Sequence, residues 1–258
     1  MTVENLLTMT SGLDCGFEPG ERELAAMRRS DNWPAFALAL PMRATPGTQY
    51  AYCSCNNHLL SAILSERTGG SALAFARTHL FDPLGISTAS WPADSHGRSH
   101  GWGDLHLFPK DLAKIGELYR NGGTWKGRRI LSESWERQST QPHVRVRDGV
   151  AYGYSWWINT AREPAIYEAV GRGGQRVAVV PDKELVSSSA RAGPETRHER
   201  IASSRDVPAV SRSHAAALRL LRGPQKADRP APVEIPDRAV KSTRRTFHCG
   251  RISMYVDI

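Results

Sequence analysis

The first half of the chain carries apolar residues at helical spacing. Leu59, Leu60, Ile63 and Leu64 form one stripe that follows Asn56-Asn57 and ends at Gly69-Gly70, which predicts a helix of about three turns. Further helices are predicted, each with a Ser or Pro at its start; they cover Ser71 to Leu80, Pro109 to Tyr119 and, more briefly, Ser132 to Ser139.

After Gly153 the spacing of apolar residues changes to that of strands. Short runs rich in β-branched and aromatic residues are separated by Gly, Pro or charged turns, and they cover Tyr154 to Ile158, Ile166 to Val170, Arg176 to Val180 and Glu184 to Val186. Helices followed by a meander of strands predict an α+β fold with an antiparallel sheet and a mainly helical lobe.

Apolar periodicity stops after Val186. Residues 187–258 hold 14 Lys and Arg against 7 Asp and Glu, a net charge of +7 out of +8 for the whole chain. Only Ala215 to Leu221 has the pattern of a short helix, so we expect a folded domain over 1–186 and a basic tail of low order over 187–258. The basic residues alternate with acids and prolines and have few aromatic neighbours, so we expect no nucleic-acid binding, with an anion-binding tail as the weaker alternative.

Composition and cysteine content narrow the class further. The 258 residues are 40% hydrophobic and 23% charged, as in an ordinary globular protein. No apolar run reaches the roughly 18 residues of a membrane span, and the first residues lack the features of a signal peptide. The four cysteines are irregularly spaced, and Cys53 and Cys55 are too close to bridge without strain. The Cys-x-Cys-x-x-His pattern ending at His58 shows no fourth ligand, so we expect neither a metal nor another cofactor.

Several short motifs occur in an informative order. They are Leu6-Leu7-Thr8-Met9-Thr10-Ser11-Gly12-Leu13, Pro46-Gly47-Thr48-Gln49-Tyr50-Ala51-Tyr52-Cys53-Ser54, Phe81-Asp82-Pro83-Leu84-Gly85-Ile86, Gly101-Trp102-Gly103, Tyr152-Gly153-Tyr154-Ser155-Trp156-Trp157 and Gly171-Arg172-Gly173-Gly174-Gln175. Together they resemble the serine β-lactamase and penicillin-binding-protein-like hydrolases, in the branch of class C β-lactamases, esterases and 6-aminohexanoate-oligomer hydrolases. The resemblance covers roughly residues 2 to 186 and implies a β-lactamase/transpeptidase-like fold.

The resemblance also implies a serine acyl-enzyme mechanism on a small amide or ester substrate. Tyr52 would be the general base and later the general acid, and Ser54 would hydrogen-bond to substrate or to a lysine. Arg172-Gly173-Gly174 would stand where the family has Lys or His before its glycine, and the backbone N–H of Gln175 would be an oxyanion donor. Trp102 would be either a wall of the substrate cleft or a packing residue.

One motif of that family is missing. Its Ser-x-x-Lys pair, which supplies the nucleophile, lies some tens of residues before the run that begins at Leu6, and only five residues precede Leu6 here. The residues three positions before the six lysines are Leu107, Asp111, Gly123, Val180, Gly223 and Arg238. We therefore expect a domain that is incomplete at its N-terminus, and an end that has diverged or changed frame after Val186.

Losing the lysine affects the tyrosine as well as the serine. An ordinary tyrosine has a pKa of about 10, and lowering it to about 7 needs roughly 4 kcal/mol. An ammonium about 4 Å away supplies about that much. Without it, Tyr52 is expected to stay a neutral phenol unless Arg172 comes close. Two hypotheses follow: a hydrolase of this family, or an inactive relative that at most binds acyl or peptide ligands.

Overall fold

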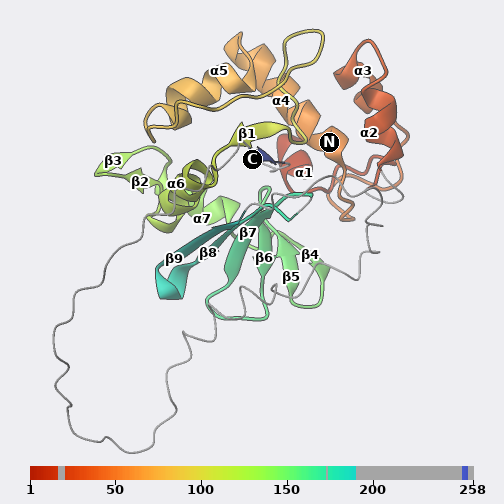
Figure 1. Ribbon diagram of the computed structural model, residues 1–258. Coiled ribbons are helices and arrows are strands. Elements are labelled where there is room, and N and C mark those ends of the chain that lie inside the picture. Colours follow the sequence, from red (N-terminus) through yellow and green to blue (C-terminus); the bar gives the residue numbers. More distant parts are fainter. Residues whose placement is uncertain (17–20, 173, 190–251, 255–258) are drawn as a thin grey trace, which may run out of the picture. The chain divides into compact units, whose positions relative to one another are not determined.

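The computed structural model describes residues 1–16, 21–172, 174–189 and 252–254 (Figure 1), and all of them belong to one compact unit. The N-terminal helices gather around α4, which contacts α1, α2, α3 and α5. Their bounds are α1 Val3–Leu7, α2 Arg22–Met27, α3 Trp33–Leu38, α4 Ser54–Thr68 and α5 Ala72–Ala76, which continues as a π-helical turn over Arg77–Phe81.

The caps of these helices follow from local chemistry. Thr2 and Asn5 form a reciprocal capping box at the start of α1. The side chain of Asn32 caps α3 and that of Ser71 caps α5, each accepting a hydrogen bond from the backbone N–H three residues on. Gly69 ends α4 with a φ of 72°, a left-handed conformation that glycine adopts readily. The helices predicted after Asn56-Asn57 and from Ser71 are confirmed as α4 and as α5 with its π-helical turn.

The second half of the described chain consists of two helices and a sheet. The helices are α6 Pro109–Arg120 and α7 Glu133–Ser139, with a short hairpin of β2 Thr124–Trp125 and β3 Arg128–Arg129 between them. The sheet is an antiparallel meander in sequence order, made of β4 Val144–Arg147, β5 Val150–Tyr152, β6 Trp157–Asn159, β7 Ile166–Val170, β8 Arg176–Val180 and β9 Leu185–Ser189. The predicted bounds of β7 and β8 are confirmed.

Strand β6 begins later than the sequence predicted. The expected strand started at Tyr154, but the backbone N–H of Tyr154 bonds to the carbonyl of Ser139 and that of Ser155 bonds to the carbonyl of Leu7. Ser155 also has a φ of 61°, which is not an extended conformation. The segment before Trp157 is therefore a turn that ties the sheet to α7 and α1.

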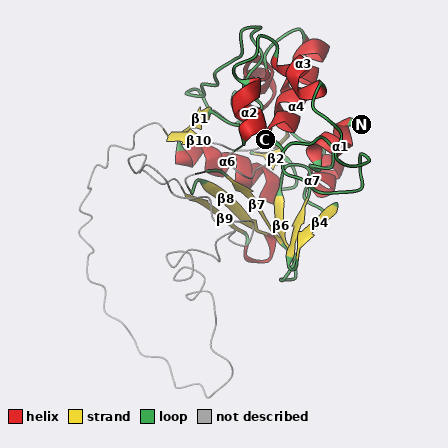
Figure 2. Ribbon diagram, turned by 90° about the vertical axis from the view of Figure 1, so that its right-hand side faces the viewer, coloured by secondary structure: helices red, strands yellow, loops and turns green. Residues whose placement is uncertain are grey.

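Helix α6 packs on the sheet over β8 and β9 (Figure 2). A Cβ atom at Gly116 would lie 2.7 Å from Cγ1 of Val186 and 2.8 Å from Cγ1 of Val177, so the glycine permits this close approach. The larger core cluster fills the space between α6 and the sheet, and a second cluster lies around α4. Among the described residues, no helix has the length and apolar character that a membrane crossing requires.

Strand β9 extends beyond the predicted strand end at Val186. Strand β9 continues to Ser189, because Ser187, Ser188 and Ser189 pair through their backbones with β8 and need no apolar pattern to do so. Another strand, β10 Ile252–Met254, pairs antiparallel with β1 Leu105–Leu107. The rest of the expected low-order tail, with the short helical pattern at Ala215 to Leu221, lies outside the described residues.

Candidate active site

Tyr52 lies two residues before α4, against residues of the neighbouring strands β5 and β6. Its ring is half-buried and stacks on the ring of Trp157 with centroids 6.2 Å apart and an interplanar angle of 15°. The ring of Tyr152 meets it edge-on at 6.4 Å. Trp157 begins β6 and Tyr152 ends β5. The sheet therefore orients the tyrosine through aromatic contacts on two sides.

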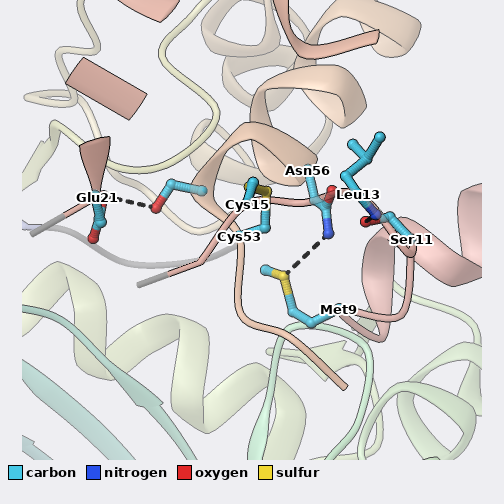
Figure 3. Close-up of a disulfide and its surroundings, with 8 residues drawn as sticks. Met9, Ser11, Leu13, Cys15, Glu21, Cys53 and Asn56 are labelled. Carbon is cyan, nitrogen blue, oxygen red and sulfur yellow. Dashed lines mark hydrogen bonds between the residues drawn. A yellow bond between two sulfur atoms is a disulfide. The ribbon is translucent and has the colours of Figure 1, made fainter. Parts of the chain in front are cut away.

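Ser54 begins α4 and points to a carboxylate that the sequence analysis did not identify. Its Oγ donates a hydrogen bond of 3.1 Å to Oε2 of Glu21, which Figure 3 labels. Nη2 of Arg172 lies 2.6 Å from Oε1 of the same carboxylate. Glu21 thus joins the Tyr-x-Ser segment to the turn that follows β7.

The side chains of Glu21 and Arg172 differ in their exposure to solvent. The side chain of Glu21 is 8% exposed, whereas that of Arg172 is 45% exposed. Burial raises the pKa of the Glu21 carboxyl above its usual range, although the charge of Arg172 and the hydrogen bonds from Ser54 and Arg172 act in the opposite direction. No sequence motif marks Glu21. Its position depends on contacts with residues 33 and 151 positions away along the chain.

The turn between β7 and β8 contains the rest of the predicted site. The backbone N–H of Gly171 donates to the carbonyl of Gln175 at 2.8 Å, and the N–H of Gly174 donates to the carbonyl of Gly171 at 3.3 Å. Gly174 is exposed and has a φ of 88°, which a residue with a side chain rarely adopts. Gln175 is buried. Gly173 lies outside the described residues.

Trp102 lies in the core rather than at the surface of the site. It is 3% exposed. Its ring stacks on His100 at 4.5 Å and contacts Trp33 at 5.1 Å. Of the two roles that the sequence left open, the structure shows packing. A contact between Trp102 and substrate stays a prediction that this burial disfavours.

A disulfide holds the Tyr-x-Ser segment in place. Cys53, between Tyr52 and Ser54, bonds to Cys15 with a Cα–Cα distance of 5.6 Å (Figure 3). Asn56 adds a weaker link from α4, because its Nδ2 lies 3.6 Å from Sδ of Met9. No local pattern in the sequence predicts this disulfide, because the partners are 38 residues apart and meet only through tertiary structure.

The described lysines are engaged on other elements. Lys114 donates to the carbonyl of Gly85 and pairs with Asp111. Lys110 lies over the ring of Phe108, Lys126 lies over the ring of Trp125, and Lys183 pairs with Asp182. The structure therefore brings Ser54, Arg172 and Glu21 together near the tyrosine segment, without a Ser-x-x-Lys pair in the sequence to complete them.

A comparison with known protein families shows to which family this chain belongs. The sequence profile of the family described as Beta-lactamase matches residues 1–200. The chain belongs to the beta-lactamase family. The predicted family resemblance and the predicted α+β fold are confirmed.

Two curated relatives are similar to this chain. The 6-aminohexanoate-dimer hydrolase of Paenarthrobacter ureafaciens is 26% identical over 194 residues, which cover 69% of this chain and 49% of the relative. A D-aminopeptidase of Cereibacter sphaeroides is 28% identical over 191 residues, which cover 71% of this chain and 31% of the relative. The chain spans about half the length of the first relative and about a third of the second.

Solved structures agree on the fold. A penicillin-binding protein from Bacillus halodurans matches with a TM-score of 0.59 and 18% identity, over 73% of this chain and 69% of that one. An octameric penicillin-binding protein homologue from Pyrococcus abyssi matches with a TM-score of 0.54 and 22% identity, over 73% and 51% of the two chains. At these identities the likeness is one of fold.

Proposed function

We propose that this chain carries the tyrosine side of a serine-hydrolase site for small amide or ester substrates. In this proposal Tyr52 transfers the proton between nucleophile, substrate and leaving group. Membership of the beta-lactamase family supports the reaction class. The aromatic contacts of Tyr52 with Trp157 and Tyr152 support the role, because a proton-transfer residue needs a fixed orientation.

The observation that carries the proposal is the link through Glu21. This carboxylate accepts hydrogen bonds from Ser54 at the start of α4 and from Arg172 after β7, so the two segments that would flank a substrate are fixed relative to each other. The side chain of Arg172 is 45% exposed, and its guanidinium is accessible to a substrate carbonyl or carboxylate. The backbone N–H of Gln175 would serve the oxyanion, with Gly173 and Gly174 leaving room for the substrate backbone.

The nucleophile is the part of the mechanism that the 258 residues do not supply. They contain no Ser-x-x-Lys, so we propose that this chain by itself holds substrate without forming an acyl-enzyme. Oxyanion donors and binding alone can retain about 10³- to 10⁴-fold acceleration over solution. The whole protein's reaction, in this proposal, is hydrolysis of a linear amide, as the names of the two curated relatives suggest, or of a small ester.

The test is equilibrium binding of a short linear amide with a free carboxylate, measured by calorimetry on the full chain. Replacing Arg172 by Ala is expected to weaken binding about tenfold or more, since a hydrogen bond to a charged group contributes about 1.5–3 kcal/mol. Arg137→Ala is the matched control, because Arg137 pairs with Glu133 on α7. Equal affinities for wild type, Arg172→Ala and Arg137→Ala would show that the ligand does not use this site.

A further inference from the structure

Three buried sulfur atoms meet at the start of α4. The Sγ atoms of Cys15, Cys53 and Cys55 all lie within 4.8 Å of one another. The three residues are 5%, 1% and 0% exposed. Cys15 and Cys53 form the disulfide, and Cys55 is a free thiol. A disulfide therefore has a third cysteine beside it, which a disulfide does not need.

We propose that reduction of the disulfide turns this cluster into a binding site for one thiophilic metal ion of the Zn²⁺ class, held by the thiolates of Cys15, Cys53 and Cys55. A Zn–S bond of about 2.3 Å puts two sulfur ligands of one tetrahedral ion about 3.8 Å apart. In the disulfide the Sγ atoms of Cys15 and Cys53 are about 2.0 Å apart, so after reduction they must separate by about 1.8 Å, whereas the Sγ atom of Cys55, which lies within 4.8 Å of both, must move closer by about 1 Å at most. In this proposal a water molecule completes the tetrahedral coordination.

The site differs from the one that the sequence pattern suggested and then disfavoured. The Cys-x-Cys-x-x-His pattern would group Cys53 and Cys55 with His58 as metal ligands. In the structure the ring of His58 lies instead against Trp33, with its Nε2 atom 3.5 Å from Oδ2 of Asp94. Cys15, which is far away in sequence, takes the place of the histidine in the cluster.

The position of the cluster favours thiolates bound to a cation. Cys53 is the N-cap of α4 and Cys55 is its second residue, so both lie at the positive end of a 15-residue helix dipole. The carboxylates of Glu21 and Glu23 lie close enough to the Cys55 thiol to interact with it electrostatically, and a cation bound to the three sulfur atoms would be attracted by both.

Metal binding requires two steps, reduction of the disulfide and coordination of the ion. A dithiol reductant gives two electrons and two protons to the Cys15–Cys53 disulfide, which becomes two thiols while the reductant becomes a disulfide. The ion then binds three sulfur atoms and releases three thiol protons. Because Cys53 lies between Tyr52 and Ser54, the bound ion would hold this segment to Cys15 in the reduced protein, as the disulfide does in the oxidised one.

The experiment is a Zn²⁺ titration of the full chain after reduction with a phosphine, followed by a competing chromogenic chelator and by native mass. Wild type is expected to bind one ion per chain when reduced, and to lose that binding when the disulfide is formed. Cys55→Ser is expected to weaken binding by at least tenfold, since even the loss of a residue that only supports a metal ligand costs about 10- to 100-fold. Cys249→Ser is the control, because Cys249 is the one cysteine outside the proposed set.

Folding is checked separately. Cys55→Ser retains both partners of the disulfide, so its oxidised form should match wild type in circular dichroism and melting temperature. Cadmium substitution should give a thiolate-to-metal charge-transfer band in reduced wild type and a smaller band in Cys55→Ser. The proposal is overturned if reduced wild type binds no Zn²⁺, if Cys55→Ser binds it as tightly as wild type, or if the oxidised chain binds it equally well.

Discussion

The burial of His58 is expected to lower the free energy of unfolding in mild acid. Its side chain in α4 is fully buried, with the ring against Trp33 at 5.1 Å and Trp102 at 5.5 Å. Burial lowers the pKa of His58 to about 4; the nearby charge of Asp94 opposes this shift, and His100 and Arg98 add to it. The folded protein therefore holds this histidine neutral in a range where an unfolded chain protonates it.

The sign and the magnitude follow from linkage. An unfolded histidine has a pKa of about 6.5, so between pH 6.5 and about 4 the unfolded state binds one proton more than the folded state. The free energy of unfolding then falls as the pH falls. A shift from about 6.5 to about 4 corresponds to about 3.4 kcal/mol in total, of which about 1.8 kcal/mol is lost between pH 7 and pH 5.

The assay is urea unfolding at pH 7 and pH 5, followed by tryptophan fluorescence. His58→Leu should remove about 1.8 kcal/mol from the pH dependence, whatever its effect on stability at pH 7. His79→Leu is the matched control, because His79 is exposed, and should keep the wild-type dependence. An identical pH dependence in wild type and His58→Leu would refute the reasoning.

Two further predictions concern the same region. A Cβ atom at Gly101 would clash with the backbone of α4 and lie 2.6 Å from Cα of His58, so Gly101→Ala should lower the free energy of unfolding by about 3 kcal/mol or more. Gly70→Ala is the control and should cost far less, because a Cβ atom at Gly70 has its nearest contact at 3.7 Å. Equal urea midpoints for the two variants would contradict the close packing at Gly101. Removing the Cys15–Cys53 disulfide, which closes a loop of 38 residues, should cost about 4 kcal/mol in oxidising buffer. Cys15→Ala measures this cost by urea unfolding, and a loss below about 1 kcal/mol would contradict it.

The parts of the fold that the sequence predicts are those with strong local signals. Helix α6 begins at Pro109 as expected, and β7 and β8 have their predicted bounds. Helices α1, α2 and α3 were missed because each has only five or six residues, too few to show a helical repeat. Strands β4 and β5 were missed for a similar reason, because each has only three or four residues.

The candidate site was predicted as far as its motifs extend. Tyr52, Ser54 and Arg172 were identified through the resemblance to a family, and the structure brings Ser54 and Arg172 to one carboxylate. Glu21 itself could not be predicted, since a single acid in a polar segment carries no local signal. The cluster around Cys15 was missed for the same reason: its distances exist only once the chain has folded.

The most direct test of the proposed function is the intact mass of the full chain after incubation with a p-nitrophenyl ester and with a chromogenic β-lactam, alongside Tyr52→Phe and the control Tyr119→Phe. We predict no acyl adduct on any of the three proteins, and no hydrolysis that depends on Tyr52. An acyl adduct with turnover that Tyr52→Phe abolishes and Tyr119→Phe retains would contradict it, because a nucleophile within these 258 residues would then be acting with Tyr52.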